Sequence, residues 1–140
     1  ARLDQDMVNS ARYLKDHDLS TGRLGATGFC WGGGMTNRLA VTLGRDLAAG
    51  VPFYGASAPS DDVAKITAAL MIIYAGTDPR INAMWPEYEV ALKAHGVTFE
   101  MHMFEGTLHG FHNNSTPRYN EAAAALAWNH TIGFFRKHLV

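Results

Sequence analysis

Three residues with reactive side chains each follow an apolar run of the sequence. Cys30, the single cysteine, ends the apolar run over 24–30, Asp78 comes after the run over 69–75, and His109 lies in a loop after the run over 97–104. A thiol, a carboxylate and an imidazole can act together as a nucleophile, an orienting acid and a general base. His109 would take the thiol proton and later return it to the leaving group, while Asp78 would orient the imidazole. We therefore predict a Cys-His-Asp catalytic triad.

The sequence around Cys30 is typical of a sharp turn between a strand and a helix. It reads Gly28-Phe29-Cys30-Trp31-Gly32-Gly33, with glycines two residues before and two residues after the thiol. Such a nucleophile elbow strains the backbone of the reactive residue, and we expect a side chain at either flanking glycine to collide with neighbouring backbone. The positive end of the following helix favours a thiolate. The backbone N–H of Trp31 is expected to supply one oxyanion donor.

Helical and strand patterns alternate along the chain. We expect strands over 24–30, 47–54, 69–75 and 97–104, a helical turn over 61–66, and helices over 3–16, 32–43, 84–95 and from Thr116-Pro117 to about His138. The last helix is expected to face inward with Leu126, Ile132 and Phe135. This order predicts one α/β domain over residues 1–140, a three-layer α/β/α sandwich around about four parallel strands. Ligands bind beyond the carboxyl ends of such strands, so the three reactive residues should converge there.

Composition limits the possible functions. The chain has 140 residues and a net charge of −1, which gives no electrostatic case for binding nucleic acid or an anionic membrane. A single cysteine excludes an internal disulfide and a cysteine-built zinc site, and it suits a reducing compartment, so we expect a cytoplasmic protein. No apolar run approaches the roughly 18 residues needed to cross a bilayer. The chain starts at Ala1 inside an expected helix, which suggests that an N-terminal portion is missing.

Each reactive residue also has a structural interpretation. Cys30 could be an inert buried thiol, Asp78 a turn residue before proline, and His109 a surface histidine. The glycine frame and the order of the three residues favour catalysis. His109 and His112 could suggest a metal site, but no third ligand accompanies them, so we expect no metal.

Other residues could line a substrate pocket or only fill space. Tyr54 ends the second expected strand near the same edge, and Trp31 and Trp85 could wall the pocket or pack in the core. Arg80 and Arg118 could bind an acidic substrate or remain solvated on the surface.

Three motifs in order resemble those of one family. They are Gly28-x-Cys30-x-Gly32-Gly33, Gly76-Thr77-Asp78 and Gly106-Thr107-Leu108-His109-Gly110-Phe111. With the order nucleophile, acid, histidine of α/β-hydrolases, the chain resembles the C-terminal part of the dienelactone hydrolase (carboxymethylenebutenolidase) family. The resemblance implies a truncated α/β-hydrolase fold that cleaves a small ester or lactone through a thioacyl-enzyme, with no metal or organic cofactor. It also implies that Tyr54 and Phe111 lie near the substrate.

The sequence departs from the family pattern in two ways. The family's second carboxylate-binding arginine lies four residues after the histidine, where this chain has Asn113, although Arg118 follows nearby. The family's second oxyanion donor and its other substrate-binding arginine belong to a part that precedes this chain. The strand over 24–30 would then be an exposed edge, which we expect another copy of the chain, in a homo-oligomer, or the preceding segment to cover. The alternative function is a weakly active or inactive derivative that acts as a self-associating or binding module.

Overall fold

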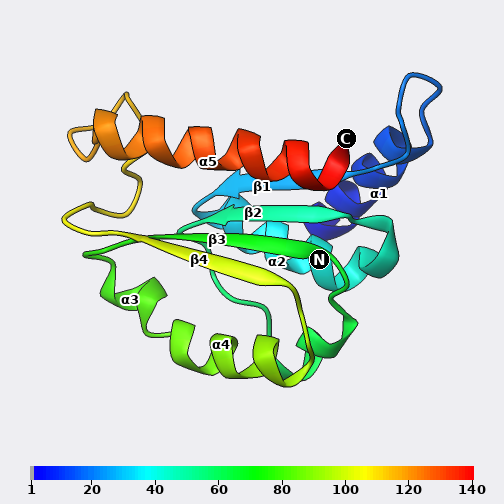
Figure 1. Cartoon of the computed structure of the whole chain (residues 1–140), viewed down its shortest axis with the longest axis horizontal. Coiled ribbons are helices and arrows are strands. Elements are labelled where there is room, and N and C mark those ends of the chain that lie inside the picture. The colour runs from blue at the N-terminus through cyan, green and yellow to red at the C-terminus, as the bar shows by residue number, and fades with distance from the viewer. Residues whose placement is uncertain (1) are drawn as a thin grey trace.

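A computed structural model describes residues 2–140 and shows a four-stranded parallel sheet between layers of helices (Figure 1). The strands are β1 (Gly25–Phe29), β2 (Ala49–Phe53), β3 (Ala69–Ala75) and β4 (Phe99–Phe104). The helices are α1 (Arg2–Asp16), α2 (Trp31–Leu43), α3 (Pro79–Asn82), α4 (Trp85–Ala94) and α5 (Glu121–Leu139), with 3-10 turns η1 (Gly44–Asp46) and η2 (Ser60–Lys65).

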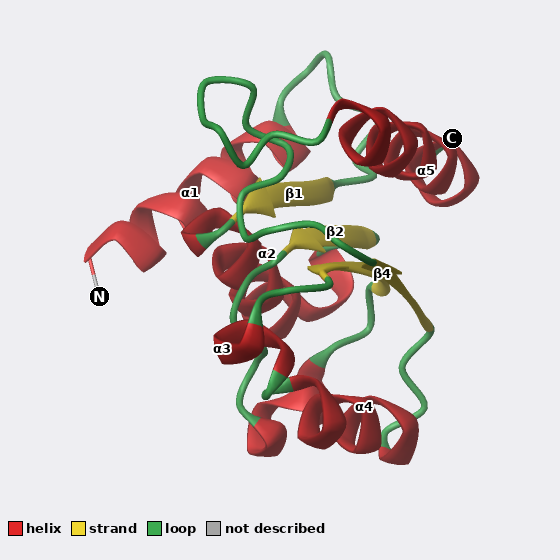
Figure 2. Cartoon of the chain, turned by 90° about the vertical axis from the view of Figure 1, so that its left-hand side faces the viewer, coloured by secondary structure: helices red, strands yellow, loops and turns green. Residues whose placement is uncertain are grey.

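The strand order is sequential, β1-β2-β3-β4, and every pairing is parallel. Right-handed crossovers between sequential parallel strands place their connecting segments on one face of the sheet. Helices α2 and α4 accordingly lie on one side, and α5 covers the other (Figure 2). The predicted α/β fold with four parallel strands is therefore confirmed.

Strand β3 is buried along its whole length and divides the apolar interior into two clusters. Leu70, Ile72 and Tyr74 face the cluster formed with α1, α2 and α4. Met71 and Ile73 face the cluster formed with Ala127 and Phe134 of α5. This two-sided burial explains the continuous apolar run of β3.

Helix α5 ends beside the first strand of the sheet. A Cβ atom added at Gly25 would lie 2.7 Å from the Cδ1 atom of Leu139, so the helix end packs directly on β1. The Arg23 Nη2 atom also donates a hydrogen bond of 2.7 Å to the backbone oxygen of His138. The end of α5 is thereby held against the start of β1 and the loop before it.

The last helix begins later than predicted. It starts at Glu121, where the Asn120 side chain accepts a hydrogen bond from the Ala123 N–H, and not at Thr116-Pro117. The Asn120 N–H is bonded to the Phe111 oxygen, which keeps the preceding residues in a loop.

The face that α5 turns inward also differs from the prediction. The buried residues are Ala124, Ala127, Thr131 and Phe134, whereas Leu126 is half exposed. Ile132 and Phe135 are only partly buried. Ala127 and Phe134 pack with residues of β2 and β3, and this packing decides which face of α5 turns inward.

The outer edge of β1 has no strand partner within residues 2–140. Beside it lies an apolar cavity of about 240 Å³, lined by residues that include Leu14, Leu24 and Leu39. The strand over 24–30 is therefore an edge in this structure, as predicted. None of the helices within residues 2–140 is long and apolar enough to cross a membrane.

Candidate active site

Cys30 lies between β1 and α2 with a backbone φ of 54°. Its N–H donates to the Phe53 oxygen at 3.1 Å, and its own oxygen accepts from the Gly34 N–H at 3.1 Å. These bonds fix the turn to the neighbouring strand and to the first turn of the helix. The left-handed conformation of a non-glycine residue at this point is the strain expected of a nucleophile elbow.

The two flanking glycines of the elbow are not equivalent. A Cβ atom at Gly28 would lie 2.3 Å from the Gly32 oxygen, so a side chain there would collide with backbone. A Cβ atom at Gly32 would meet no atom of the described chain within 4 Å, apart from its own helix and its two neighbours in the chain. The predicted collision at Gly32 is therefore wrong, because Gly32 borders the open cavity beside β1.

Close approach between α2 and the loop after β2 also requires glycine. A Cβ atom at Gly33 would lie 2.4 Å from the Phe53 oxygen, and one at Gly55 would lie 2.2 Å from the Gly34 nitrogen. The glycine run therefore lets the start of the helix pack against the end of β2.

Asp78 and His109 meet although 31 positions separate them. The Asp78 Oδ2 atom lies 2.5 Å from the His109 Nδ1 atom, and its Oδ1 atom caps α3 through the Ile81 N–H. The Thr77 N–H and the Thr77 hydroxyl both donate to the Thr107 oxygen, which joins the two loops. The carboxylate is buried and holds an imidazole that is about a quarter exposed.

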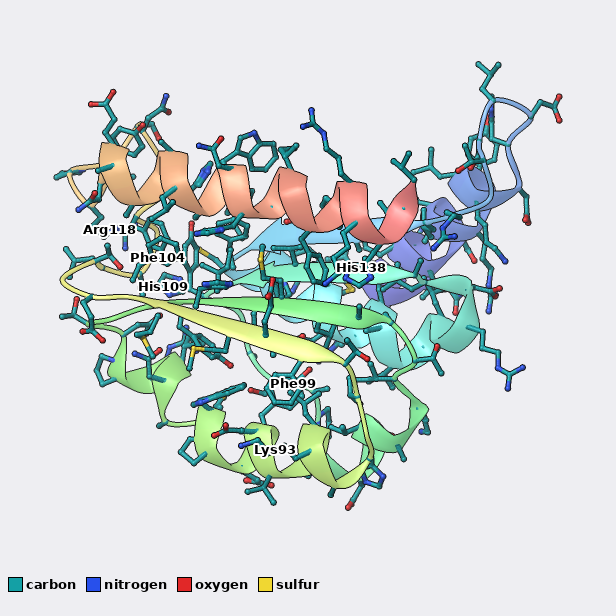
Figure 3. The ribbon with its side chains drawn as sticks, viewed as in Figure 1. Lys93, Phe99, Phe104, His109, Arg118 and His138 are labelled. Atoms are coloured by element: carbon teal, nitrogen blue, oxygen red, sulfur yellow. The ribbon has the colours of Figure 1, made fainter. Side chains whose placement is uncertain are left out.

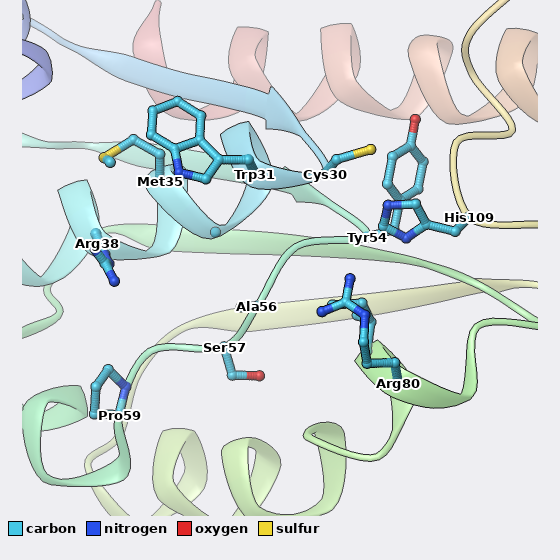
Figure 4. Close-up of a pocket in the computed structure, with 12 residues that line it drawn as sticks. Cys30, Trp31, Met35, Arg38, Tyr54, Ala56, Ser57, Pro59, Arg80 and His109 are labelled. Atoms are coloured by element: carbon cyan, nitrogen blue, oxygen red, sulfur yellow. The ribbon is translucent and has the colours of Figure 1, made fainter. Parts of the chain in front are cut away.

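Cys30 and His109 line the same cavity of about 380 Å³, with Trp31, Tyr54 and Arg80 also on its wall (Figure 4). The structure therefore brings together the three residues that the sequence predicted to converge beyond the strand ends. Further lining residues were not identified from the sequence, since Arg38, Ser57 and Pro59 carry no motif.

Burial and nearby charges together set the acidity of the thiol. Burial raises the pKa of Cys30 above its ordinary value, and the guanidinium of Arg118 lowers it. The carboxylate of Asp78 raises this pKa further, and Arg80 lowers it. Because burial is the largest cause, the resting thiol holds its proton at neutral pH and needs a base to release it.

A second cavity, of about 310 Å³, opens on the other side of Cys30 and Tyr54, and Asn113 and Arg118 line it. The Arg118 guanidinium packs over Gly110, where an added Cβ atom would lie 3.6 Å from its Cζ atom. Figure 3 shows Arg118 and His109 at the same end of the sheet.

Two predicted pocket residues do not line either cavity at Cys30. Trp85 packs against the rings of Tyr74 and Phe99 at 5.7 and 5.9 Å, on the face covered by α4. Phe111 is fully buried behind Tyr54, with ring centroids 5.4 Å apart. Both belong to the core: Trp85, at the start of α4, packs against the first apolar cluster, and Phe111, in the loop after β4, is part of the second.

His112 lies near the site but has an apolar environment. Its ring contacts Phe29 at 4.9 Å and Trp128 at 5.9 Å, and burial lowers its pKa. Within residues 2–140, no group of three or more potential ligands could hold a metal ion.

The model of the family described as dienelactone hydrolase matches residues 1–139. The chain belongs to the dienelactone hydrolase family. A Bradyrhizobium protein named "Probable 2-oxo-3-(5-oxofuran-2-ylidene)propanoate lactonase" is 31% identical over 148 residues, covering 96% of this chain and 59% of the relative. A mouse carboxymethylenebutenolidase homolog is 33% identical over 116 residues, covering 79% of this chain and 45% of the relative.

Dienelactone hydrolase-like proteins of known structure share the fold. The promiscuous phosphotriesterase P91 from metagenomic libraries superposes with a TM-score of 0.82 at 21% identity, covering 98% of this chain and 60% of that protein. The chain thus spans about half the length of the relatives it matches, from 45% to 60% of those named here.

Proposed function

We propose that this chain hydrolyses a small carboxylic ester or lactone through a covalent thioacyl intermediate on Cys30. The observation that carries the proposal is the bonded Asp78–His109 pair, whose imidazole shares one cavity with a thiol at a strained elbow. Strained backbone at a reactive side chain is characteristic of functional positions.

The first half of the proposed reaction forms the thioacyl-enzyme. His109 takes the thiol proton, and the Cys30 sulfur attacks the substrate carbonyl carbon. The Trp31 N–H, at the start of α2, donates to the developing oxyanion. When the intermediate collapses, the carbon–oxygen bond to the alcohol breaks, and His109 returns its proton to the departing oxygen.

The second half releases the acid. His109 takes a proton from water, and the resulting hydroxide attacks the thioester carbonyl. The carbon–sulfur bond then breaks, and the sulfur recovers its proton from His109. Asp78 stabilises the imidazolium in both halves, and the proposed steps use only these side chains and water.

Two arginines favour substrates with an acidic group. Arg80 and Arg118 line the two cavities that meet at Cys30, and within residues 2–140 neither forms an ion pair. An anionic group on either side of the scissile bond would find a cation there. The lactone named for the Bradyrhizobium relative is a propanoate, which has such a group.

Turnover of small activated esters tests the proposal. We expect the unmodified chain to release the alcohol, and we expect Cys30→Ala to abolish turnover while the variant still folds by circular dichroism. Leu19→Ala, in the exposed turn after α1, is the matched control and should retain activity. Absence of turnover, together with a Cys30 that resists alkylation, would instead support the alternative function as a self-associating or binding module.

We further propose that β1 is covered in the working protein by a second copy or by a preceding segment of a longer chain. Its unpaired edge and the apolar cavity beside it support this. A free thiol nucleophile also supports a reducing compartment such as the cytoplasm.

A further inference from the structure

Two non-glycine residues of the described chain have a positive φ, and they are neighbours in space. They are Cys30, at 54°, and Tyr54, at 34°. Phe29 is paired with Phe53 in the β1–β2 register, so Cys30 and Tyr54 are the next residues along two adjacent strands. The elbow explains the strain at Cys30, but no motif explains the strain at Tyr54. Such strain persists where the surrounding structure enforces it, and it gathers at functional sites.

The backbone of Tyr54 is held on both sides. Its N–H donates to the Ile73 oxygen of β3 at 2.7 Å. The next residue, Gly55, approaches the start of α2 so closely that an added Cβ atom would lie 2.2 Å from the Gly34 nitrogen. The chain therefore turns sharply at Tyr54, and this turn directs the ring to the edge of the sheet where Cys30 lies.

The ring of Tyr54 forms a wall between the reactive residues and the core. Its centroid lies 5.0 Å from that of His109 and 5.4 Å from that of Phe111. Tyr54 is only 1% exposed, yet it lines both cavities that meet at Cys30. In Figure 4 the sulfur of Cys30 points to the side where Tyr54 and His109 lie.

The hydroxyl of Tyr54 is available as a donor. Burial is the main reason that the pKa of Tyr54 is raised to about 12; the sulfur of Cys30 adds to this effect, and a backbone hydrogen bond from His112 opposes it. The O–H therefore keeps its proton at neutral pH and cannot serve as a base. The backbone hydrogen bond from His112 uses a lone pair of the phenol oxygen and does not use its proton.

We propose that Tyr54 is a further catalytic residue, whose hydroxyl donates a hydrogen bond to the leaving-group oxygen of the substrate. This inference rests on the proposed function. As the tetrahedral intermediate collapses, the carbon–oxygen bond breaks and its electron pair stays on the oxygen. His109 transfers its proton to that oxygen, while Tyr54 donates a hydrogen bond and retains its own proton.

The position of Tyr54 favours the leaving group over the oxyanion. The oxyanion donor, the Trp31 N–H, belongs to the start of α2. Tyr54 instead lies at the end of β2, with its ring against His109, which delivers the proton to the departing oxygen. A substrate oxygen that His109 protonates would lie against the same aromatic wall, and we therefore assign the leaving group to Tyr54.

The test compares esters of one acid with different alcohols in the Tyr54→Phe variant. Phenylalanine keeps the ring and removes only the hydroxyl. With a 4-nitrophenyl ester, whose leaving group needs little help, kcat/KM should change by less than about threefold. With an alkyl ester, it should fall by about 10- to 100-fold, as expected for loss of a hydrogen bond to a charged oxygen. A plot of rate against leaving-group pKa should therefore be steeper for the variant.

Tyr88→Phe is the matched control. It also removes a buried hydroxyl, one that donates to the Asn37 Oδ1 atom away from the site. It should leave the leaving-group dependence unchanged. Two results in Tyr54→Phe would overturn the role of Tyr54: an equal loss of rate on all esters, or no loss on any. Intact mass of the unmodified chain separates this from failure of the proposed function, because the thioacyl adduct would still form. If the unmodified chain forms no adduct with any ester, the proposed function fails, and this role fails with it.

Discussion

At the scale of single residues, burial and nearby charged side chains together set the pKa of the Cys30 thiol. Burial raises the pKa of Cys30, and the two nearby guanidinium groups oppose this effect. The thiol is therefore protonated at rest, and in the proposed reaction it becomes a nucleophile when His109 accepts its proton. If this proposal holds, the Asp78–His109 pair is as important for the reaction as the sulfur itself.

The Asp78→Asn variant tests the pair. The amide preserves the shape of the carboxyl group but cannot hold the imidazole in the same tautomer or stabilise its positive charge. We expect kcat to fall about a hundredfold to ten-thousandfold, with a smaller change in KM. Steady-state kinetics on an activated ester measures this, and retention of more than half of the activity would contradict the assigned role.

The Arg118→Gln variant tests the electrostatics of the thiol. Arg118 lowers the Cys30 pKa, so its removal should raise that pKa and reduce the thiolate fraction at any given pH. The pH profile of iodoacetamide labelling should therefore shift to higher pH. Arg45→Gln, in η1 and outside both cavities at Cys30, serves as the control and should leave the profile in place. An unchanged profile in Arg118→Gln would show that this guanidinium does not act on the thiol.

Residue types and spacing were enough to predict Cys30, Asp78 and His109 as a group, because each follows a strand of one parallel sheet. They were not enough to place the aromatic residues. Trp85 and Phe111 are core residues, and only the packing of α4 and of the loop after β4 decides this. The strain at Tyr54 has no counterpart in the sequence pattern, since tyrosine rarely adopts a positive φ.

At the scale of elements, the elbow and its helix are built on close backbone contacts. Gly28, Gly33 and Gly55 each lie where a side chain would overlap backbone of another segment. The spacing of the glycines around Cys30 predicted the tight turn, but it did not separate Gly28, which is required, from Gly32, which is not. The start of α5 was likewise mispredicted, because the loop that delays it is held by a long-range bond from Asn120 to Phe111.

Alanine substitutions at the two flanking glycines should separate their roles. Gly28→Ala places a Cβ atom 2.3 Å from the Gly32 oxygen, so we expect a loss of about 1–3 kcal/mol of unfolding free energy. Gly32→Ala meets open space and replaces a helical glycine, so its stability should stay the same or rise. Urea denaturation measures both, and equal effects at the two positions would refute the described turn.

At the scale of the whole molecule, the sheet has two edge strands, β1 and β4, each with one strand partner within residues 2–140. Helices cover both faces of the sheet, and an apolar cavity lies beside β1. The strand was predicted to be an edge from the resemblance to the family, in whose complete sheet it has further strands beside it. We propose that a second copy of the chain or a preceding segment of a longer chain covers that edge.

Self-association of the 140-residue chain should depend on this cavity. Leu14 lines it from α1 and is more than half exposed. We expect dimers at high protein concentration in sedimentation velocity, and we expect Leu14→Glu to shift them to monomers. Leu19→Glu adds the same charge to an exposed loop outside the cavity and should not. A monomeric wild-type chain at all concentrations would contradict the proposed interface between copies.

The central claim is covalent catalysis by Cys30, and rapid mixing with a 4-nitrophenyl ester followed by acid quenching and peptide mass mapping tests it most directly. We expect an acyl adduct on the peptide that contains Cys30, formed within the first turnover and absent from Cys30→Ala. In His109→Asn the adduct should form much more slowly. Turnover of the ester with no adduct on Cys30, or with the adduct on another residue, would contradict the account.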